Sequence, residues 1–298
     1  MARHDSSVCS SCLPHVGVLT IVFRFWGLRA LPGSVGARLG GMFKKLLAAV
    51  GVGGAEVETE LHTPGVQPGG VVQGVIRLRG GEVAQEIPGL FAELVTRVEH
   101  EAGDDEVEAM RGFHKVQVAR DVALPPGQVV ESPFSLPVPL ETPVTHYRDR
   151  PLPGPVVSVR TTLEIKSAVD ATDTDPIGVG ALPAQHVLLE GIERLGFRLH
   201  RADVEAGRLG GTRQRLPFYQ EIEFAGSSRY PRLNQLEVSF VADEHGMDVV
   251  LEADKKAGLL SSGRDLINVV RVDYGTVHNL DWAAELHPLL ESMSSGRL

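Results

Sequence analysis

Between residues 42 and 274 the chain repeats one kind of segment, a short run of alternating apolar and polar residues closed by Pro, Gly or Asp. A period of two residues is typical of antiparallel strands with one buried face and one wet face. Pro137, Pro139 and Pro143 would remove ladder hydrogen bonds from a central strand, so we expect residues 134–144 at a sheet edge or at a crossing between sheets. The predicted strands cover residues 55–62, 71–79, 90–101, 114–122, 133–140, 156–169, 197–204, 218–224, 233–241, 247–253 and 266–274.

Helical periodicity interrupts this series near its middle. Ala184, Leu188 and Ile192 share one apolar face, which predicts a helix over residues 183–195 that begins at a Pro and ends before a Gly. The internal Gly191 lowers the stability of this helix by about 1 kcal/mol, so we expect the helix to depend on tertiary packing.

Short helices are also predicted near both ends of the chain. Apolar residues recur at helical spacing over residues 42–50, and Gly51 follows as a stop. Near the C-terminus, Asp281 can cap a helix that begins at Trp282. Pro288 is expected to kink or stop that helix.

These elements predict an all-β protein of two tandem β-sandwich domains, with a helix near the domain junction and short terminal helices. A chain of 298 residues fits about two domains. The predicted boundaries are residues 42–176 for the N-terminal sandwich, 177–275 for the second sandwich with its helix at 183–195, and 276–298 for a C-terminal helix and tail. Residues 1–41 are interpreted as a disordered extension or as upstream sequence wrongly assigned to the chain.

The first 41 residues differ in composition from the rest. They contain four Arg, one Asp and neither Lys nor Glu, a charge of +3, whereas the whole chain carries −9, which argues against nucleic-acid binding. Their apolar stretch, residues 16–23, is shorter than the ~20 residues of a membrane span, although a signal peptide with a minimal apolar core remains an alternative. Both cysteines, Cys9 and Cys12, lie here as a lone CxxC, so the sequence from Met42 onward suits a reducing cytoplasm.

Motifs that carry catalysis are absent from the sequence. It contains no GxSxG, GxxxxGK[ST] or GxGxxG segment, and its histidines do not pair at helical spacing. We therefore expect no catalytic residue, no metal site and no cofactor. Asp170, Asp173 and Asp175 could offer calcium oxygens, but the Gly and the closing Glu of an EF-hand loop are missing. They are interpreted as turn-capping residues of a domain linker, so calorimetry should show no micromolar calcium site that Asp173→Ala removes.

Several segments resemble a known family. They are MFKKLLAAVGVG (residues 42–53), AEVETEL (55–61), LVTRVE (94–99), VRTTLEI (159–165) and DATDTDPI (170–177). In this order, and with a helix at the midpoint, they resemble the bacterial sporulation-control proteins with an arrestin-like fold, over about residues 42–284. The resemblance implies two arrestin-like sandwiches, no known catalytic activity and a role in the control of sporulation or cell development.

An asymmetry of charge suggests a docking surface. Residues 194–232 contain eight Arg, no Lys and four acids, whereas residues 99–108, a predicted hairpin tip, contain six acids. The forked guanidinium group suits carboxylate or phosphate, so the expected partner is an acidic or phosphorylated protein segment, or a second copy of the chain in a homodimer. The alternative is that these Arg pair within their own domain with Asp203, Glu205, Glu221 and Glu223. The candidate partner-binding residues are Arg208, Arg213, Arg215, Arg229 and Arg232.

The resulting interpretation is a non-enzymatic, cytoplasmic, arrestin-like adaptor that binds other proteins, with no nucleic-acid partner and no membrane span. The alternative is an extracytoplasmic β-sandwich that binds carbohydrate or cell-wall material. It would need an export signal in residues 1–41 and exposed aromatic residues, which make up only 5% of the chain. A sandwich-based hydrolase would need a catalytic constellation that the sequence lacks. N-terminal mass spectrometry of the native protein distinguishes the first two.

A chain that begins at Met42 should melt like the full-length chain, because residues 1–41 lack strand periodicity and the remaining elements complete both predicted domains. Scanning calorimetry of the two chains checks this. A drop in melting temperature of several degrees, which corresponds to roughly 1 kcal/mol, would show that the extension contributes to the fold.

Overall fold

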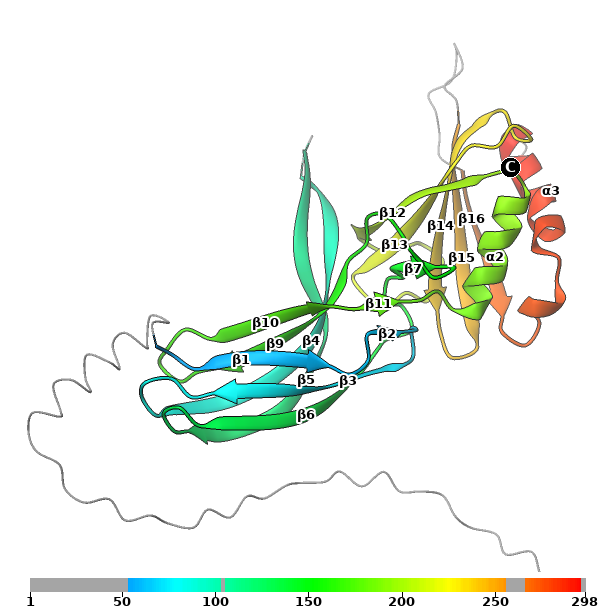
Figure 1. Cartoon of the computed structure of the whole chain (residues 1–298). Coiled ribbons are helices and arrows are strands. Elements are labelled where there is room, and N and C mark those ends of the chain that lie inside the picture. Colours follow the sequence, from blue (N-terminus) through cyan, green and yellow to red (C-terminus); the bar gives the residue numbers. More distant parts are fainter. Residues whose placement is uncertain (1–52, 103–104, 256–265, 296–298) are drawn as a thin grey trace, which may run out of the picture.

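The N-terminal part of the chain is a β-sandwich. The computed structural model describes residues 53–102, 105–255 and 266–295, most of them in strands (Figure 1), and the extension 1–41 and the helix predicted over 42–50 lie outside these residues. One sheet has the strand order β1-β3-β6, which are Glu56–Leu61, Val71–Arg79 and Val129–Pro137. The facing strands have the order β10-β9-β4-β5, which are Ala171–Pro176, Val157–Glu164, Gln85–Ala102 and Asp105–Leu124.

Alternate residues of these strands form the core of the sandwich. In β3, Ile76 and Leu78 are fully buried, while the residues between and beside them are half-buried or exposed. They share one apolar cluster with Leu90 and Leu94 of the facing strand β4. The period of two residues therefore predicted both the strands and their buried face. The edge position predicted from the prolines is confirmed for β6, which pairs only with β3 among the described strands.

The C-terminal part is a single antiparallel sheet with helices on one face. Its strands follow one another in sequence order, β12-β13-β14-β15-β16, and are Arg198–Ala206, Phe218–Ala225, Leu233–Ala242, Gly246–Lys255 and Leu266–Asp273. Two helices, α2 (Pro183–Arg194) and α3 (Trp282–Ser295), lie side by side against this sheet, as Figure 1 shows. The described residues therefore contain a sheet covered by helices where a second β-sandwich was predicted.

The helices replace a second sheet because each carries an apolar stripe. Ile192 of α2 and Leu290 of α3 are fully buried in the same cluster as Phe224 and Leu236 of the sheet. A sheet with one apolar face needs only one covering layer, and two helices supply it here. Period-two alternation in the strands is the same whether a sheet or a helix covers them, so alternation alone could not distinguish the two arrangements.

Close contact between the helices depends on Gly191. A Cβ atom at this position would lie 2.7 Å from the Cβ of Trp282, so any larger residue would push α3 away from α2. The predicted cap of α3 is confirmed, because Asp281 Oδ1 accepts a hydrogen bond from the backbone N–H of Ala283 at 3.2 Å. The glycine that weakens α2 as an isolated helix therefore serves its packing.

Helix α3 does not stop at Pro288, so of the two predicted effects of this proline, a kink or a stop, the stop is wrong. The helix continues to Ser295 because residues beyond the proline, Leu290 and Met293, are buried in the core. This burial offsets the hydrogen bond that the proline cannot make. Within the described part of the chain, neither this helix nor any other combines the length and apolar character needed to cross a membrane.

Strand β4 belongs to both regions. It pairs with β9 from Gly89 to Thr96, and three residues later it pairs in parallel with β12, where Glu99 lies opposite Glu205. This contact joins the strands of both regions in one continuous order, β10-β9-β4-β12-β13-β14-β15-β16. The end of the β4–β5 hairpin projects away from the sandwich in Figure 1. The hairpin is confirmed, although residues 103–104 at its tip lie outside the described part.

Short strands without alternation complete the junction. They are β2 (Gly65–Val66), β7 (His146–Tyr147), β8 (Arg150–Pro151) and β11 (Gly178–Val179). β2 pairs in parallel with β11, and β7 and β8 form a hairpin. In the turn of this hairpin, Arg148 lies 2.9 Å from Glu190 and 2.9 Å from Glu193 of α2. These pairs attach the hairpin to the helix that covers the second sheet.

The Asp cluster before α2 lies on a strand, so its assignment to a linker is wrong. β10 pairs with β9 along its whole length as an edge of the sandwich. Asp173 of this strand accepts a hydrogen bond from the backbone N–H of Thr59 at 2.6 Å. Asp170, just before the strand, accepts one from the N–H of Ile165 at 3.0 Å, so the turn-capping role holds for this residue. Backbone donors from the facing sheet and the preceding turn thus engage these carboxylates.

Asp173→Ala should lower the free energy of unfolding by about 1–3 kcal/mol, because the N–H of the buried residue Thr59 would lose a charged acceptor. Thr172→Ala, at an exposed position of the same strand, is the control and should change stability by no more than ~0.5 kcal/mol. Urea unfolding of the three proteins checks this. Equal stabilities of the two variants would contradict the assigned role of Asp173.

Candidate functional site

The face of the C-terminal sheet opposite the helices carries a band of carboxylates. In β12 to β15, acidic residues alternate with the apolar residues that pack under the helices. At the junction, β4 adds one more carboxylate to the same face. We call this set the acidic band, and its members are Glu99, Asp203, Glu205, Glu221, Glu223, Glu237 and Glu252.

Strand register places acidic residues of the band directly opposite one another. Glu99 faces Glu205 across β4 and β12, and Asp203 faces Glu221 across β12 and β13. Glu237 of β14 lies opposite an acidic residue on each side, one in β13 and one in β15. Like charges at directly opposite positions destabilise a sheet, so ionised carboxylates of the band repel one another across neighbouring strands.

Arg201 neutralises part of this charge. Its Nε lies 2.7 Å from Glu223, and its Nη2 lies 3.4 Å from Asp203. Both carboxylates are buried, whereas the guanidinium is about half exposed. The alternative to a docking role was that arginines pair with acids of their own region. Arg201 does so.

Burial raises the pKa of two carboxyls of the band. The pKa of Asp203 rises to about 8 because of burial, a hydrogen bond with Glu223 and the negative charge of Glu223. The pKa of Glu221 also rises to about 8, first through burial and then through the charges of Glu237 and Asp203. Burial opposes ionisation of Glu223 as well, but hydrogen bonds with Arg201 and Asp203 leave its pKa lowered. Asp203 and Glu223 therefore hold one proton between them near neutral pH.

Two groups of carboxylates in the band are close enough to share a cation. One oxygen from each of Glu99, Asp203 and Glu205 lies within 4.8 Å of the others, and a second group of this kind is Glu221, Glu237 and Glu252. Motif reading of the sequence missed both groups, because their members come from two or three strands. The available signal was the spacing of acids two residues apart within β12 and within β13, which puts them on one face.

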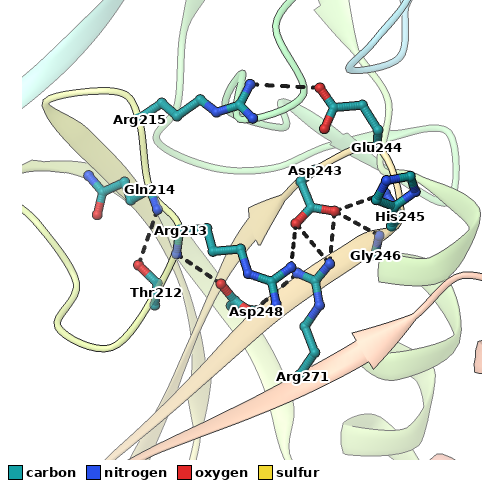
Figure 2. Close-up of polar contacts among 10 residues, drawn as sticks. All are labelled: Thr212, Arg213, Gln214, Arg215, Asp243, Glu244, His245, Gly246, Asp248 and Arg271. Atoms are coloured by element: carbon teal, nitrogen blue, oxygen red, sulfur yellow. Dashed lines mark hydrogen bonds and ion pairs between the residues drawn. The ribbon is translucent and has the colours of Figure 1, made fainter.

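The five candidate arginines are all exposed, but they do not form one surface. Arg213 lies in an ion-pair network at the edge of the sheet, shown in Figure 2. Its guanidinium is 2.9 Å from Asp243, and Arg271 lies 2.8 Å from the same carboxylate. The backbone N–H of Arg213 also donates to Asp248 at 2.9 Å. Arg213 therefore helps to hold its loop against β15 and β16.

Asp243 is the centre of this network. Hydrogen bonds from Arg271 hold the pKa of its carboxyl well below the ordinary value, against the opposing effect of burial, and the N–H of His245 and the side chain of Arg213 add to the lowering. Reversal of charge at Arg213 would place two carboxylates together here. Such a variant would therefore disturb this network, although Arg213 is exposed.

Two of the other candidates share the loop of Arg213, and the remaining two lie in a groove. Arg208 donates a hydrogen bond to the backbone oxygen of Gln214 at 3.0 Å, within the loop that also contains Arg213. Arg215 is 3.7 Å from Glu244, and both side chains are largely exposed. Arg229 and Arg232 line a groove beside the C-terminal half of α3. Whether any of these residues binds a partner stays a prediction.

Glu221→Gln should raise the melting temperature by several degrees at pH 8, and the gain should vanish near pH 4. The folded pKa of about 8 exceeds the ordinary value of 4.5, so the folded protein keeps a proton that the unfolded chain releases. Wild-type stability therefore falls as pH rises from 4.5 to 8 and is constant above, whereas glutamine has no proton to lose. Thermal melts from pH 4 to 9 check this, with Glu60→Gln on the exposed face of β1 as control. A gain that does not change with pH would contradict the assignment.

Comparisons with known proteins confirm the resemblance found in the sequence. The family model described as SpoOM protein matches residues 43–257. The sporulation-control protein spo0M of Bacillus subtilis (strain 168) is 37% identical over 258 residues, which cover 84% of this chain and 96% of that protein. The crystal structure of Spo0M, sporulation control protein, from Bacillus subtilis matches with a TM-score of 0.68 at 32% identity, over 82% of this chain and 99% of that chain. The chain therefore belongs to the Spo0M family.

Proposed function

We propose that this chain is a non-enzymatic, arrestin-like adaptor that acts in the control of sporulation or cell development. The observation that carries the proposal is the match to a protein named for sporulation control, which extends over 96% of that protein's length. A match of this extent includes both regions of the fold rather than one shared domain. It supports a common role more strongly than similarity of a single sandwich would.

An adaptor binds through surfaces, and the charged groups of this chain are arranged on surfaces. The five candidate arginines are all exposed, whereas the members of the acidic band are half-buried or buried. Complementary charge of this kind sets the rate and specificity of protein association. The acidic band would repel a phosphate backbone, so protein partners are favoured over nucleic acid. A cytoplasmic location is proposed because both cysteines precede Met42.

Among the candidate arginines, Arg229 and Arg232 fit a docking role best. They line one groove together with Ser292 and Ser295 of α3. Arg213 fits less well, because Asp243 already neutralises it. Guanidinium groups beside hydroxyl groups suit an acidic or phosphorylated protein segment. A second copy of the chain offers the same chemistry through its acidic residues.

Deletion of the gene in its source organism should change the number of viable spores or the timing of development, and a plasmid copy should restore the wild-type count. Spore counts and time-lapse microscopy measure the two effects. An unchanged count and unchanged timing in the deletion strain would contradict a role in developmental control.

The same strain tests the docking residues. Arg229→Glu combined with Arg232→Glu should fail to restore the count while its melting temperature stays within about 2 °C of wild type, because exposed substitutions change stability little. Arg150→Glu, an exposed arginine of the β7–β8 hairpin, is the matched control and should restore the count. Full restoration by the double variant would remove Arg229 and Arg232 from the docking surface.

A further inference from the structure

The junction between the two regions holds an unusual pair of charges. β4 and β12 meet at one pair of opposite residues, and both are glutamates, Glu99 and Glu205. Asp203 lies two residues before Glu205 on the same face of β12, and one oxygen from each of the three carboxylates lies within 4.8 Å of the others. This contact therefore joins two strands where three carboxyl groups meet.

A buried oxygen of Asp203 supplies an independent observation. The residue is only 6% exposed, and its Oδ1 has no hydrogen-bond partner among the described residues. The other oxygen, Oδ2, faces Arg201, which precedes Asp203 by two residues, whereas Glu205 follows Asp203 by two. Glu223, which shares a hydrogen bond with Asp203, lies opposite Arg201 across β12 and β13, and so on the same side of Asp203 as Arg201. On this ground we assign Oδ1 to the group with Glu99 and Glu205. A buried carboxylate oxygen without a donor is costly, and a bound cation would satisfy it.

We propose that Glu99, Asp203 and Glu205 bind a hard divalent cation, Ca²⁺ or Mg²⁺, at the junction of β4 and β12. Carboxylate oxygens are the ligands that these cations prefer. Three oxygens spread evenly around a Ca²⁺ ion at about 2.3–2.6 Å lie about 4.0–4.5 Å from one another, so three oxygens within 4.8 Å of one another can reach a shared ion after a small shift. Glu99 and Glu205 are half-buried, which leaves room for water to complete the coordination sphere.

The other acidic groups of the chain lack this combination. In the group of Glu221, Glu237 and Glu252, no buried oxygen without a partner is found in the described structure. The Asp cluster of β10 has a buried oxygen without a partner, Oδ2 of Asp175, but among the described residues its carboxylates do not form a group of three whose oxygens lie within 4.8 Å of one another. These two groups therefore serve as internal controls for a site at the junction.

A cation at this position would affect the whole molecule. It would replace repulsion between β4 and β12 with a shared positive centre, and so stabilise the contact that joins the sandwich to the second sheet. The protein with bound cation would hold its two regions more firmly together than the protein without it. This inference does not depend on the proposed role in sporulation.

Isothermal titration calorimetry of the full chain with CaCl₂ and with MgCl₂ tests the site, at about pH 8.5 because metal ligands must be deprotonated. We expect one site with a dissociation constant of roughly 10⁻⁵ to 10⁻³ M for at least one of the two ions. The same ion should raise the melting temperature by several degrees, because it binds the folded protein selectively. Glu99→Gln combined with Asp203→Asn should weaken binding at least tenfold and abolish the thermal shift.

Two matched variants locate the site. The first, Glu237→Gln combined with Glu252→Gln, removes two charges from the same face. The second, Asp173→Ala, alters the Asp cluster of β10. Each variant should bind the ion as wild type does. Absence of binding up to about 10 mM of either ion would overturn the proposal. Equal loss of binding in the Glu237/Glu252 variant would overturn it as well, because it would show diffuse attraction to the acidic band. Circular dichroism of each variant confirms that it is folded.

Discussion

The pairing of β4 with β12 is the contact on which the arrangement of the two regions depends. β4 contributes Leu90 and Leu94 to the core of the sandwich, and a few residues later Glu99 lies opposite Glu205 of the second sheet. Hydrogen bonding fixes the register of neighbouring strands, so this contact sets where the second sheet begins relative to the first. The parallel pairing of β2 with β11 supports the same junction at a second point.

Repulsion between carboxylates opposes the pairing of β4 with β12. The acidic band gathers charge at a sheet face, and the chain lowers the resulting repulsion in two ways that the structure shows. Arg201 lies between Asp203 and Glu223, and the raised pKa values of Asp203 and Glu221 keep protons on the band near neutral pH. Residues that served only the fold would be expected to avoid such an arrangement.

Local pattern predicted much of the fold, and its failures have physical causes. β3 and α2 follow their predicted ranges closely, because their apolar periods are regular and their ends carry turn or cap residues. The helical cover of the second sheet was not predicted, because period-two alternation does not reveal what packs on a strand. Short strands such as β7 and β11, with two residues each, have no period to detect. Pro288 was expected to kink or stop a helix that tertiary burial extends to Ser295.

Less of the candidate site than of the fold could be predicted from the sequence. Composition identified the Arg-rich stretch, and the structure then divided it between a loop at the sheet edge and a groove beside α3. Four carboxylates of the acidic band, in β12 and β13, were named as alternative partners for those arginines, which holds for Asp203 and Glu223 with Arg201. Their grouping across strands depends on register between β4, β12 and β13, and register is a long-range property.

Neighbouring charges, rather than exposure alone, decide which arginine is available to a partner. Arg213 and Arg215 are two residues apart in one loop and both are exposed. Arg213 lies 2.9 Å from Asp243, a carboxylate that Arg271 also binds, so a partner would have to compete with an established network. Arg215 lies 3.7 Å from the exposed Glu244, a pair that contributes little and that an incoming carboxylate could replace. A docking surface in this fold is therefore to be sought among arginines whose ion pairs are weak and exposed, because only these can exchange partners without loss of the local structure.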